Sequence, residues 1–302
     1  MPAARPQKFQ VEFTEDPRAF LTACAGHLAA EPVVNTIVAS VTARLAGSDP
    51  LPTVEHPRWW AVVRDADDAV VGVAMRTAPF APHPVYVLPM PGGAAVALAE
   101  ALLQRCEPLG GVNGALPAAQ VVAREHAGRT GARVRVHEHL RLFEAREVAV
   151  PPAPPGRLRP ATEADAGLVL EWFRDFGRAA AEQAGRSEPH AGSGESFTLA
   201  DVLVRVREGV VWLWEDPAGR TVHLTAANPP AYDVARIGPV YTPVEHRGRG
   251  YARAAVAAVS QLQLRSGVRP CLFTDQANPT SNRVYESVGY RPLVDMVNLV
   301  LE

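Results

Sequence analysis

The sequence predicts a mixed α/β protein built from two tandem units, and three observations support this prediction. Short apolar runs rich in β-branched residues alternate with stretches of helical period along the chain. Four prolines within residues 151–155 indicate a stiff, extended spacer near the middle. The stretches before and after this spacer resemble each other, and a length of 302 residues suits two domains.

The composition argues against several classes of function. The chain has 47% hydrophobic and 21% charged residues, and 30 basic against 32 acidic residues give a formal charge of −2. No overall basic field therefore favours nucleic acid or an anionic membrane, and neither is expected as a partner. Three cysteines are too few and too scattered for a disulfide framework or a zinc site, so no metal is expected. The first residues contain no apolar leader, which predicts a cytoplasmic protein.

The expected domains are residues 1–150 and 158–302, joined by a proline-rich linker at 151–157. The second domain is predicted to begin with a short strand and a helix. Thr162 is the expected N-cap of this helix, because Asp165 follows it in the capping-box position before an apolar run.

The rest of the second half alternates between the two periods. A stretch rich in Gly, Ser and charge at 184–196 is predicted to be a mobile loop. Three apolar runs then predict an antiparallel meander, namely GVVWLWED, TVHLTAANPP and VARIGPVYT. A helical period begins after Gly250 and ends at Gly267. The strand VRPCLFTD, a helix capped by Asn278 and ended by Gly289, and the strand DMVNLVLE complete the expected order.

The first half shows the same order of patterns, which indicates an internal repeat. WWAVVRDADDAVVGVAMRTA corresponds to the later hairpin VVWLWEDPAGRTVHLTAA, and PVYVLPMPGGAAVALAEALL corresponds to PVYTPVEHRGRGYARAAVAAV. The strand-to-helix turn of the first copy is MPGGAA and lacks the arginines of the second. We therefore expect the N-terminal copy to be degenerate, without an anion site.

The turn EHRGRGYARA has the features of an anion site. A glycine-rich turn between a strand and a helix leaves the first helical N–H groups unpaired, with the positive end of the helix dipole behind them. Gly248 and Gly250 let the backbone approach a phosphate, and Arg247 and Arg249 add charge at the rim. The turn has no Gly-Lys-Ser/Thr, and Arg253 replaces the third glycine of a dinucleotide fingerprint. The alternative is a tight turn with solvated arginines.

Two motifs together resemble the GNAT superfamily of N-acetyltransferases. The acyl-coenzyme A signature of that family has the core Gln/Arg-x-x-Gly-x-Gly/Ala, and a second signature has an Asn, a small residue three positions on, a Tyr seven positions on, and Gly-Phe or Gly-Tyr. The matching residues are Arg247, Gly248, Arg249, Gly250, Tyr251 and Ala252, and then Asn278, Ser281, Tyr285, Gly289 and Tyr290. The resemblance covers about residues 156 to 302 well, and 1–150 only through the repeat.

The resemblance implies two tandem GNAT-like domains, each with a central mixed, mostly antiparallel sheet flanked by helices. It also implies acetyl-CoA, or a related acyl-CoA, as co-substrate. Backbone amides from Arg249 to Ala252 would hold the pyrophosphate, and Asn278 and Asn282 would lie on the far side of the pantetheine arm. The strand residues that would pair with that arm are Val240, Tyr241 and Thr242.

The resemblance also assigns Tyr285 as the general acid that protonates the leaving CoA thiolate. By its position between Val284 and Val288, the same residue could instead be an ordinary core aromatic. The general base stays open, because surface positions are the default interpretation of Glu215, His223, Asp233 and Glu245, and a water chain could serve. His246 is expected at the rim of the turn.

The implied function is direct transfer of an acetyl group from acetyl-CoA to a primary amine of a small molecule or peptide. The alternative is a sensor or scaffold module that binds acyl-CoA without catalysis, and an enzyme that acylates an alcohol or thiol is a further one. The first half could be a substrate lid, a structural partner or an inactive duplicate. Either a monomer or a homodimer is expected.

Overall fold

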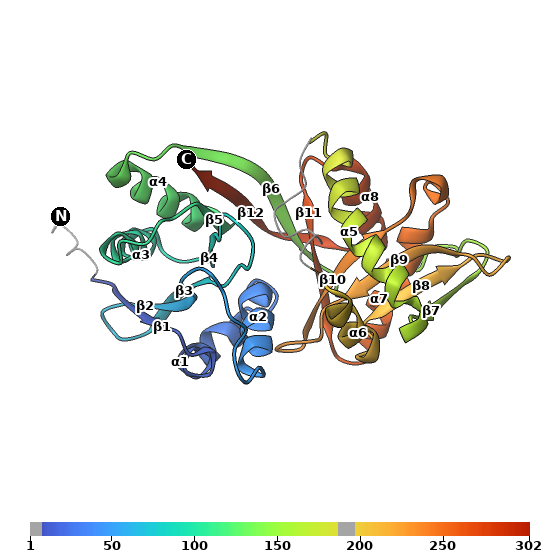
Figure 1. The fold of residues 1–302 in the computed structure, drawn as a ribbon, viewed down its shortest axis with the longest axis horizontal. Helices are drawn as coiled ribbons and strands as arrows, with labels where there is room; N and C mark the ends of the chain where they lie inside the picture. The colour runs from blue at the N-terminus through green and yellow to red at the C-terminus, as the bar shows by residue number, and fades with distance from the viewer. Residues whose placement is uncertain (1–7, 187–196) are drawn as a thin grey trace. The chain divides into compact units, whose positions relative to one another are not determined.

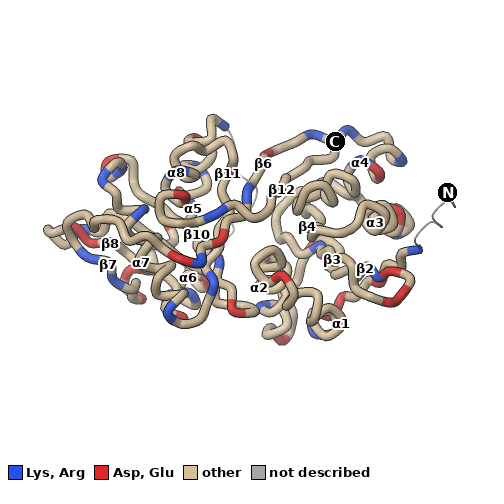
Figure 2. The backbone as a smooth tube through the Cα atoms, turned by 180° about the vertical axis from the view of Figure 1, so that it is seen from behind, with Lys and Arg blue, Asp and Glu red and all other residues tan. Residues whose placement is uncertain are grey.

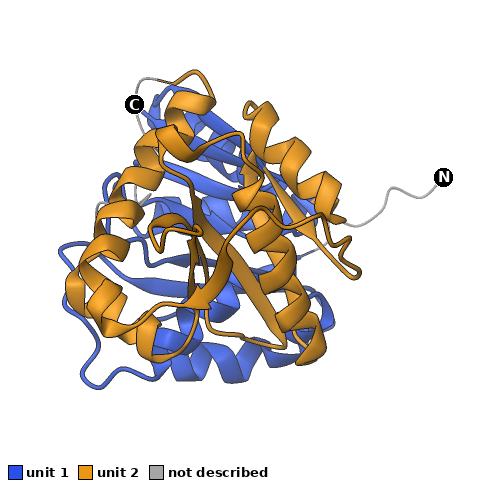
Figure 3. Cartoon of the chain, turned by 90° about the vertical axis from the view of Figure 1, so that its right-hand side faces the viewer, with its two compact units in different colours: residues 1–140, 294–302 blue, residues 141–293 orange. Residues whose placement is uncertain are grey.

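The computed structural model describes residues 8–186 and 197–302, so most of the loop predicted at 184–196 lies outside the described residues. The chain forms two compact units, one of residues 1–140 with 294–302 and one of residues 141–293 (Figure 3). Each unit has its own set of strands and helices and is described by itself.

Unit 1 is a sheet with helices on both faces (Figure 1). Its strands lie in the order β1-β2-β3-β4-β5-β12-β6, where β12 is the last strand of the chain (Arg291–Leu301). The strands β1 to β4 form an antiparallel meander, and β4 and β5 are a parallel pair. Its elements are β1 (Gln10–Thr14), α1 (Pro17–Ala30), α2 (Thr36–Ala46), β2 (Trp59–Arg64), β3 (Val70–Arg76), β4 (Val85–Val87), α3 (Gly92–Gln104), β5 (Gly111–Ala115), α4 (Ala118–Thr130) and β6 (Val134–Glu144), which runs on into unit 2.

The two faces of the unit 1 sheet are buried by different helices. Trp59 belongs to a core cluster with α3 and α4. The next residue, Trp60, points to the other face, as successive strand residues must. There its indole packs near Phe20 of α1 and donates a hydrogen bond of 2.8 Å to Thr42 Oγ1 of α2. Both indoles are fully buried, which explains why β2 is apolar on both sides.

Unit 2 repeats this order of elements. They are β7 (Arg157–Pro160), η1 (Glu163–Asp165), α5 (Ala166–Gln183), α6 (Leu199–Arg207), β8 (Val211–Glu215), β9 (Thr221–Ala227), β10 (Val234–Tyr241), η2 (Val244–His246), α7 (Tyr251–Arg265), β11 (Arg269–Asp275) and α8 (Pro279–Val288). The last strand, β12 (Arg291–Leu301), begins in unit 2 and belongs to unit 1 from residue 294 on. The strands β11-β10-β9-β8-β7 lie in that order, antiparallel except for the parallel pair β10–β11. The predicted repeat and the mixed, mostly antiparallel sheets are confirmed.

Local sequence determines where the helices of unit 2 begin. Thr162 N and Oγ1 donate hydrogen bonds to Asp165 Oδ2 at 2.7 and 2.8 Å, which is the predicted capping box. Asn278 Oδ1 accepts from the backbone N–H groups of Thr280 and Ser281, both at 3.1 Å, and caps α8 as predicted. Gly267, with a φ of 75°, follows the end of α7.

Alternating strand residues separate two cores in unit 2. On β8, Val211 and Leu213 pack in a cluster with α5 and α6. Trp212 and Trp214 face the other way, where α7 and α8 cover the sheet. The strand β9 is sandwiched between these layers, which places its side chains under either α5 or α7.

The last strand does not follow the expected division into domains, which placed all of residues 158–302 in the second domain. Residues 294–302 belong to unit 1, because β12 pairs antiparallel with β5 from Met296↔Ala115 to Val300↔Gly111. Its inward side chains, Val297, Leu299 and Leu301, lie in the core formed with α3 and α4. The apolar periodicity of β12 is correct for a strand, but it does not specify the sheet that the strand joins.

Both units carry acidic and basic residues distributed along the backbone (Figure 2). This distribution agrees with the nearly balanced charge of the sequence. Among the described helices, none combines the length and the apolar character that crossing a membrane requires.

We predict that the free energy of unfolding depends on β12 through unit 1. Leu299→Ala should lower it by about 2–5 kcal/mol, because this side chain is only 2% exposed and its removal leaves a cavity. Leu293→Ala, on the same strand but with a 45% exposed side chain, is the control and should change it by less than about 0.5 kcal/mol. Urea denaturation followed by circular dichroism measures both. Equal effects would show that β12 does not pack as described.

Candidate functional site

The strands β10 and β11 separate part of the way along their length. They pair only at Val234–Arg236 with Arg269–Cys271, although β10 continues to Tyr241. The pairing of β10 with β9 on its other side also shifts register between Ile237 and Val240. The second half of β10 therefore has a backbone edge towards β11 that no strand occupies in the described structure.

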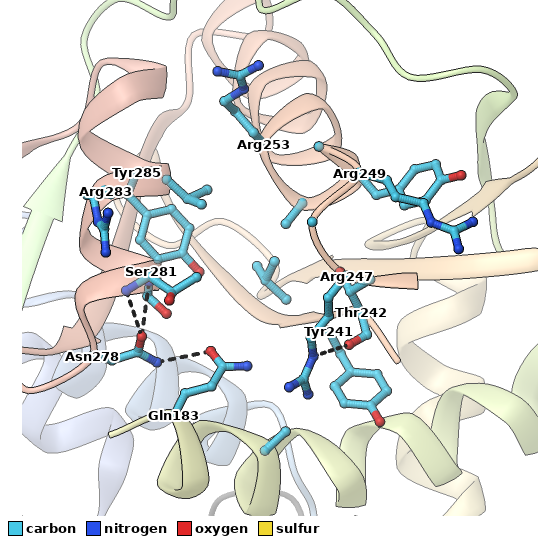
Figure 4. Close-up of a pocket in the computed structure, with 18 of the residues that line it drawn as sticks. Gln183, Tyr241, Thr242, Arg247, Arg249, Arg253, Asn278, Ser281, Arg283 and Tyr285 are labelled. Carbon is cyan, nitrogen blue, oxygen red and sulfur yellow. Dashed lines mark hydrogen bonds between the residues drawn. The ribbon is translucent and has the colours of Figure 1, made fainter. Parts of the chain in front are cut away.

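A cavity of about 790 Å³ lies at this opening, entirely within unit 2 (Figure 4). It is bounded by the linker, the C-terminal half of α5, the ends of β10 and β11, the turn at residues 247–250 (the Gly-Arg turn) and α8. Its lining includes eleven of the twelve predicted cofactor-binding residues and the predicted acid. They are Val240, Tyr241, Thr242, Arg247, Gly248, Arg249, Gly250, Tyr251, Ala252, Asn278, Ser281 and Tyr285.

The Gly-Arg turn presents backbone N–H groups to the cavity. Gly248 and Gly250 have φ values of 76° and 84°, in the left-handed region that favours glycine. Gly250 is the N-cap of α7, and no side chain caps this helix. The amides of its first turn therefore have neither a helical nor a side-chain partner, and the helix dipole makes them attractive to an anion.

The arginines of the turn are held by backbone carbonyls. Arg247 Nε donates to the Thr242 carbonyl at 3.0 Å, and Arg249 Nη2 donates to the Glu245 carbonyl at 3.1 Å. Figure 4 shows the Arg247 side chain reaching into the cavity from the turn, across from Tyr285 on α8. Arg253, on the first turn of α7, adds a third guanidinium to the lining. This side of the cavity is thus suited to bind phosphate groups.

Tyr285 is both a core residue and a cavity residue. Its side chain is 9% exposed, it belongs to a core cluster, and its ring makes an edge contact with Tyr290 at a centroid distance of 6.1 Å. Burial raises the pKa of the phenol, so the hydroxyl keeps its proton at neutral pH. Within the described residues this hydroxyl has no hydrogen-bond partner, and it lies at the cavity wall. It could therefore donate to a bound group.

Two predicted asparagines have different positions. Asn278 lines the cavity and is 3% exposed; besides capping α8, its Nδ2 donates to Gln183 Oε1 at 3.3 Å. Asn282 is not part of the lining. Its amide accepts from Thr274 Oγ1 at 2.6 Å and donates to the carbonyls of Asp275 and Gln276, both at 3.3 Å, so it holds the turn after β11.

None of the four candidate bases lines this cavity. Glu215 is bonded by Arg159 and Arg157, and the hydrogen bond from Arg159 holds the pKa of Glu215 below its usual value. His223 is not a surface residue, because it is completely buried in β9. Asp233, in the turn before β10, and Glu245, in η2, lie outside the lining, whereas His246, next to Glu245, is part of it.

Asp275 is the one carboxylate among the described lining residues. It forms an ion pair with Arg186, and its Oδ1 accepts from the N–H of Ala277 at 2.8 Å. Groups of three or more His, Cys, Asp or Glu residues that could hold a metal are absent from residues 8–186 and 197–302.

Sequence reasoning missed the wall that α5 contributes. Phe176, Ala179, Ala180 and Gln183 line the cavity, and their spacing of three and four residues places them on one helical face. This spacing is visible in the sequence and could have predicted that the four residues share one face of the helix. Phe273 and Thr274 on β11 had no such signal, because only the separation of the two strands exposes them.

The corresponding region of unit 1 is closed. All three residues of β4 pair with β5, and a Cβ on Gly114 of β5 would lie 2.0 Å from the Val87 carbonyl oxygen of β4. At the start of α3, a Cβ on Gly93 would lie 2.7 Å from the ring of Phe9, so an aromatic side chain covers the first turn. This is consistent with the expected degeneracy of the N-terminal copy.

Comparisons with known proteins agree with this geometry. Residues 219–298 match the family described as FR47-like protein. A GCN5-related N-acetyltransferase from Sphaerobacter thermophilus is 17% identical, with a TM-score of 0.58, and the match covers 96% of this chain and 94% of that one. A GNAT-family acetyltransferase from Colwellia psychrerythraea is 9% identical, with a TM-score of 0.56, 97% of this chain and 100% of that one being covered.

A tandem GNAT protein from the clavulanic acid biosynthesis pathway is 16% identical, with a TM-score of 0.51, and the match covers 97% of this chain and 98% of that one. No curated protein sequence matched the chain. The resemblance to the GNAT superfamily is thus confirmed: along nearly its whole length the chain has the fold of GNAT acetyltransferases, in tandem, with an FR47-like region at residues 219–298.

Proposed function

We propose that the chain is an acetyltransferase that moves an acetyl group from acetyl-CoA to a primary amine in the cavity of unit 2. One observation carries the proposal: the Gly-Arg turn, the open edge of β10 and the Tyr285 hydroxyl all border the same cavity. The catalytic domain is then the expected one from residue 158 on, but without residues 294–302, which belong to unit 1. The N-terminal domain, 1–150, has a structural role, since its equivalent opening is closed.

Acetyl-CoA supplies an activated acyl group and carries its own anchoring groups. Its pyrophosphate is suited to the unpaired amides of the α7 N-terminus, with Arg247 and Arg249 at either side. The amides of the pantetheine arm can form hydrogen bonds with the free edge of β10, in the way that an additional strand would. Pro239 has no N–H, so a backbone donor for the thioester oxygen must come from a neighbour such as Val240.

In the transfer step, the amine nitrogen forms a bond to the acyl carbon while the bond from that carbon to sulfur breaks. The Tyr285 hydroxyl donates its proton to the departing sulfur, which would otherwise leave as a thiolate. The attacking amine must also lose a proton. Because Asp275 is bonded to Arg186, we assign that proton to water rather than to a side chain. The acceptor is an amine of a small molecule or peptide.

A second function deserves a test, because Tyr285 also belongs to the core. A non-catalytic acyl-CoA-binding module would need the phosphate turn and the β10 edge, and it would use Tyr285 only for packing. The two functions make the same prediction for binding and different predictions for turnover.

For binding, we predict that the protein takes up one equivalent of acetyl-CoA and that Gly250→Asp abolishes this binding. Gly250 has a φ of 84°, which an aspartate adopts at a cost, and the new carboxylate would repel a phosphate. Isothermal titration calorimetry of both proteins measures the effect. Gly219→Asp, at a turn glycine of φ 79° outside the cavity, is the matched control and should bind normally. Wild-type protein that binds no acetyl-CoA would contradict the proposal.

For turnover, we predict that Tyr285→Phe lowers kcat by about 10²-fold and changes the Kd for acetyl-CoA less than about threefold. Because burial raises the pKa of Tyr285, the wild-type rate should not fall through loss of this proton up to about pH 10. Release of CoA thiol, measured with an amine library, reports kcat.

Tyr290→Phe is the matched control for this experiment. Its hydroxyl is bonded to Ser260 Oγ at 2.6 Å outside the cavity, so this variant should lose stability and keep kcat. An unchanged kcat in Tyr285→Phe would remove the acid role. Binding without turnover of any amine would favour the non-catalytic module.

A further inference from the structure

A histidine is completely buried directly behind the cavity. His223 lies on β9, opposite Trp214 of β8, and its side chain is on the face covered by α7. Burial lowers its pKa to about 3, so the ring is neutral at physiological pH. The catalytic mechanism described above does not use it.

Both ring nitrogens of His223 are bonded to threonine hydroxyls. Nε2 lies 2.7 Å from Thr225 Oγ1, and Nδ1 lies 2.8 Å from Thr242 Oγ1. A neutral imidazole has one donor and one acceptor nitrogen, and a hydroxyl can serve either. The pair of hydroxyls therefore satisfies the ring in full. Thr225 is fully buried within the sheet, whereas Thr242 lines the cavity.

Thr242 connects this buried group with the Gly-Arg turn. It is the first residue after β10, and its carbonyl accepts the hydrogen bond from Arg247 Nε. Figure 4 shows this bond and the guanidinium beyond it, in the cavity. With Nε occupied, the terminal nitrogens of Arg247 have no partner within the described part of the chain. They are thus free to bind an anion.

The end of β10 needs such an anchor. After Arg236 it has no β11 partner, and its pairing with β9 is irregular between Ile237 and Val240. This end is paired with β9 alone, through Val240 and Tyr241. A strand paired on one side has more accessible conformations than one paired on both, and ordering it on binding would cost affinity. The bond from His223 to Thr242 holds this end from the buried side and leaves the edge towards the cavity open.

We propose that His223 is a positioning residue for the acyl-CoA site. Through Thr242 it fixes the end of β10 and the Arg247 guanidinium in the orientation that receives the phosphates, without touching the ligand. This inference rests on the proposed function, since it concerns affinity for acetyl-CoA. It adds a buried residue that the resemblance does not assign.

Two isosteric variants separate this role from simple packing. The polar atoms of the Asn side-chain amide are the same number of bonds from Cα as Nδ1 of histidine. Those of the Gln amide are the same number of bonds from Cα as Nε2 of histidine. His223→Asn can therefore keep the bond to Thr242, and His223→Gln can keep the bond to Thr225. We expect Gln to weaken acetyl-CoA binding about 5- to 30-fold, the value of one lost hydrogen bond to a site, and Asn to stay within about threefold of wild type.

If His223 served only for packing, the Asn variant should be more impaired than the Gln variant, because Gln fills more of the volume of histidine than Asn does. Calorimetry gives the Kd for acetyl-CoA, and thermal unfolding of the same samples gives stability. A Kd that follows stability, with Asn worse than Gln, would overturn the inference.

Thr242→Val tests the same link at a partly exposed position, in case the His223 variants do not fold. It should weaken binding about 5- to 30-fold in the wild type and less than twofold in an Arg247→Ala background, because both changes remove one coupled unit. If the losses of affinity in the two variants were additive, or if Thr242→Val left the Kd unchanged, the inference would be overturned while the proposed function would stand. Failure of the wild type to bind acetyl-CoA would overturn the proposed function, and the inference with it.

Discussion

The separation of β10 from β11 is the constraint on which the rest of unit 2 depends. Two parallel strands that stay paired leave no room for a ligand, because their backbone groups satisfy one another. Once they part after Arg236, the backbone of β10 is available to a bound molecule, and the helices on either side form the walls of the opening. Pro239 and the register shift near Val240 occur where this separation begins, so the sequence disfavours regular pairing at this point.

The two units show how one order of elements can produce either an open or a closed sheet. In unit 1 the parallel pair is complete, Gly114 allows the strands to approach closely, and Phe9 covers the start of α3. In unit 2 the corresponding helix begins after Gly250, where a Cβ would meet no other atom within 4 Å. A few local choices of residue, rather than a different topology, therefore separate the open sheet of unit 2 from the closed sheet of unit 1.

Much of the fold could be predicted from sequence because its signals are local. The capping box of Thr162 and Asp165, the N-cap of Asn278 and the turn of Gly250 depend on neighbours within a few residues, and the structure has each of them. The burial of His223 could not be predicted, since alternation in TVHLTAA fits an outward or an inward histidine equally well. The position of β12 in the sheet could not be predicted either, because the alternation of apolar residues identifies a strand but does not specify its partner strand.

The placement of β12 has a consequence for how the chain acquires its structure. The strand β5 pairs with a strand that is synthesised long after it. The hydrogen bond from Leu301 N–H to the Gly110 carbonyl likewise joins residues far apart in the sequence. Contacts of such separation carry a large loop-closure entropy and slow folding. Until residues 294–302 have left the ribosome, the core of unit 1 stays incomplete and β5 has an exposed edge, which is a route to aggregation or to exchange of strands between chains.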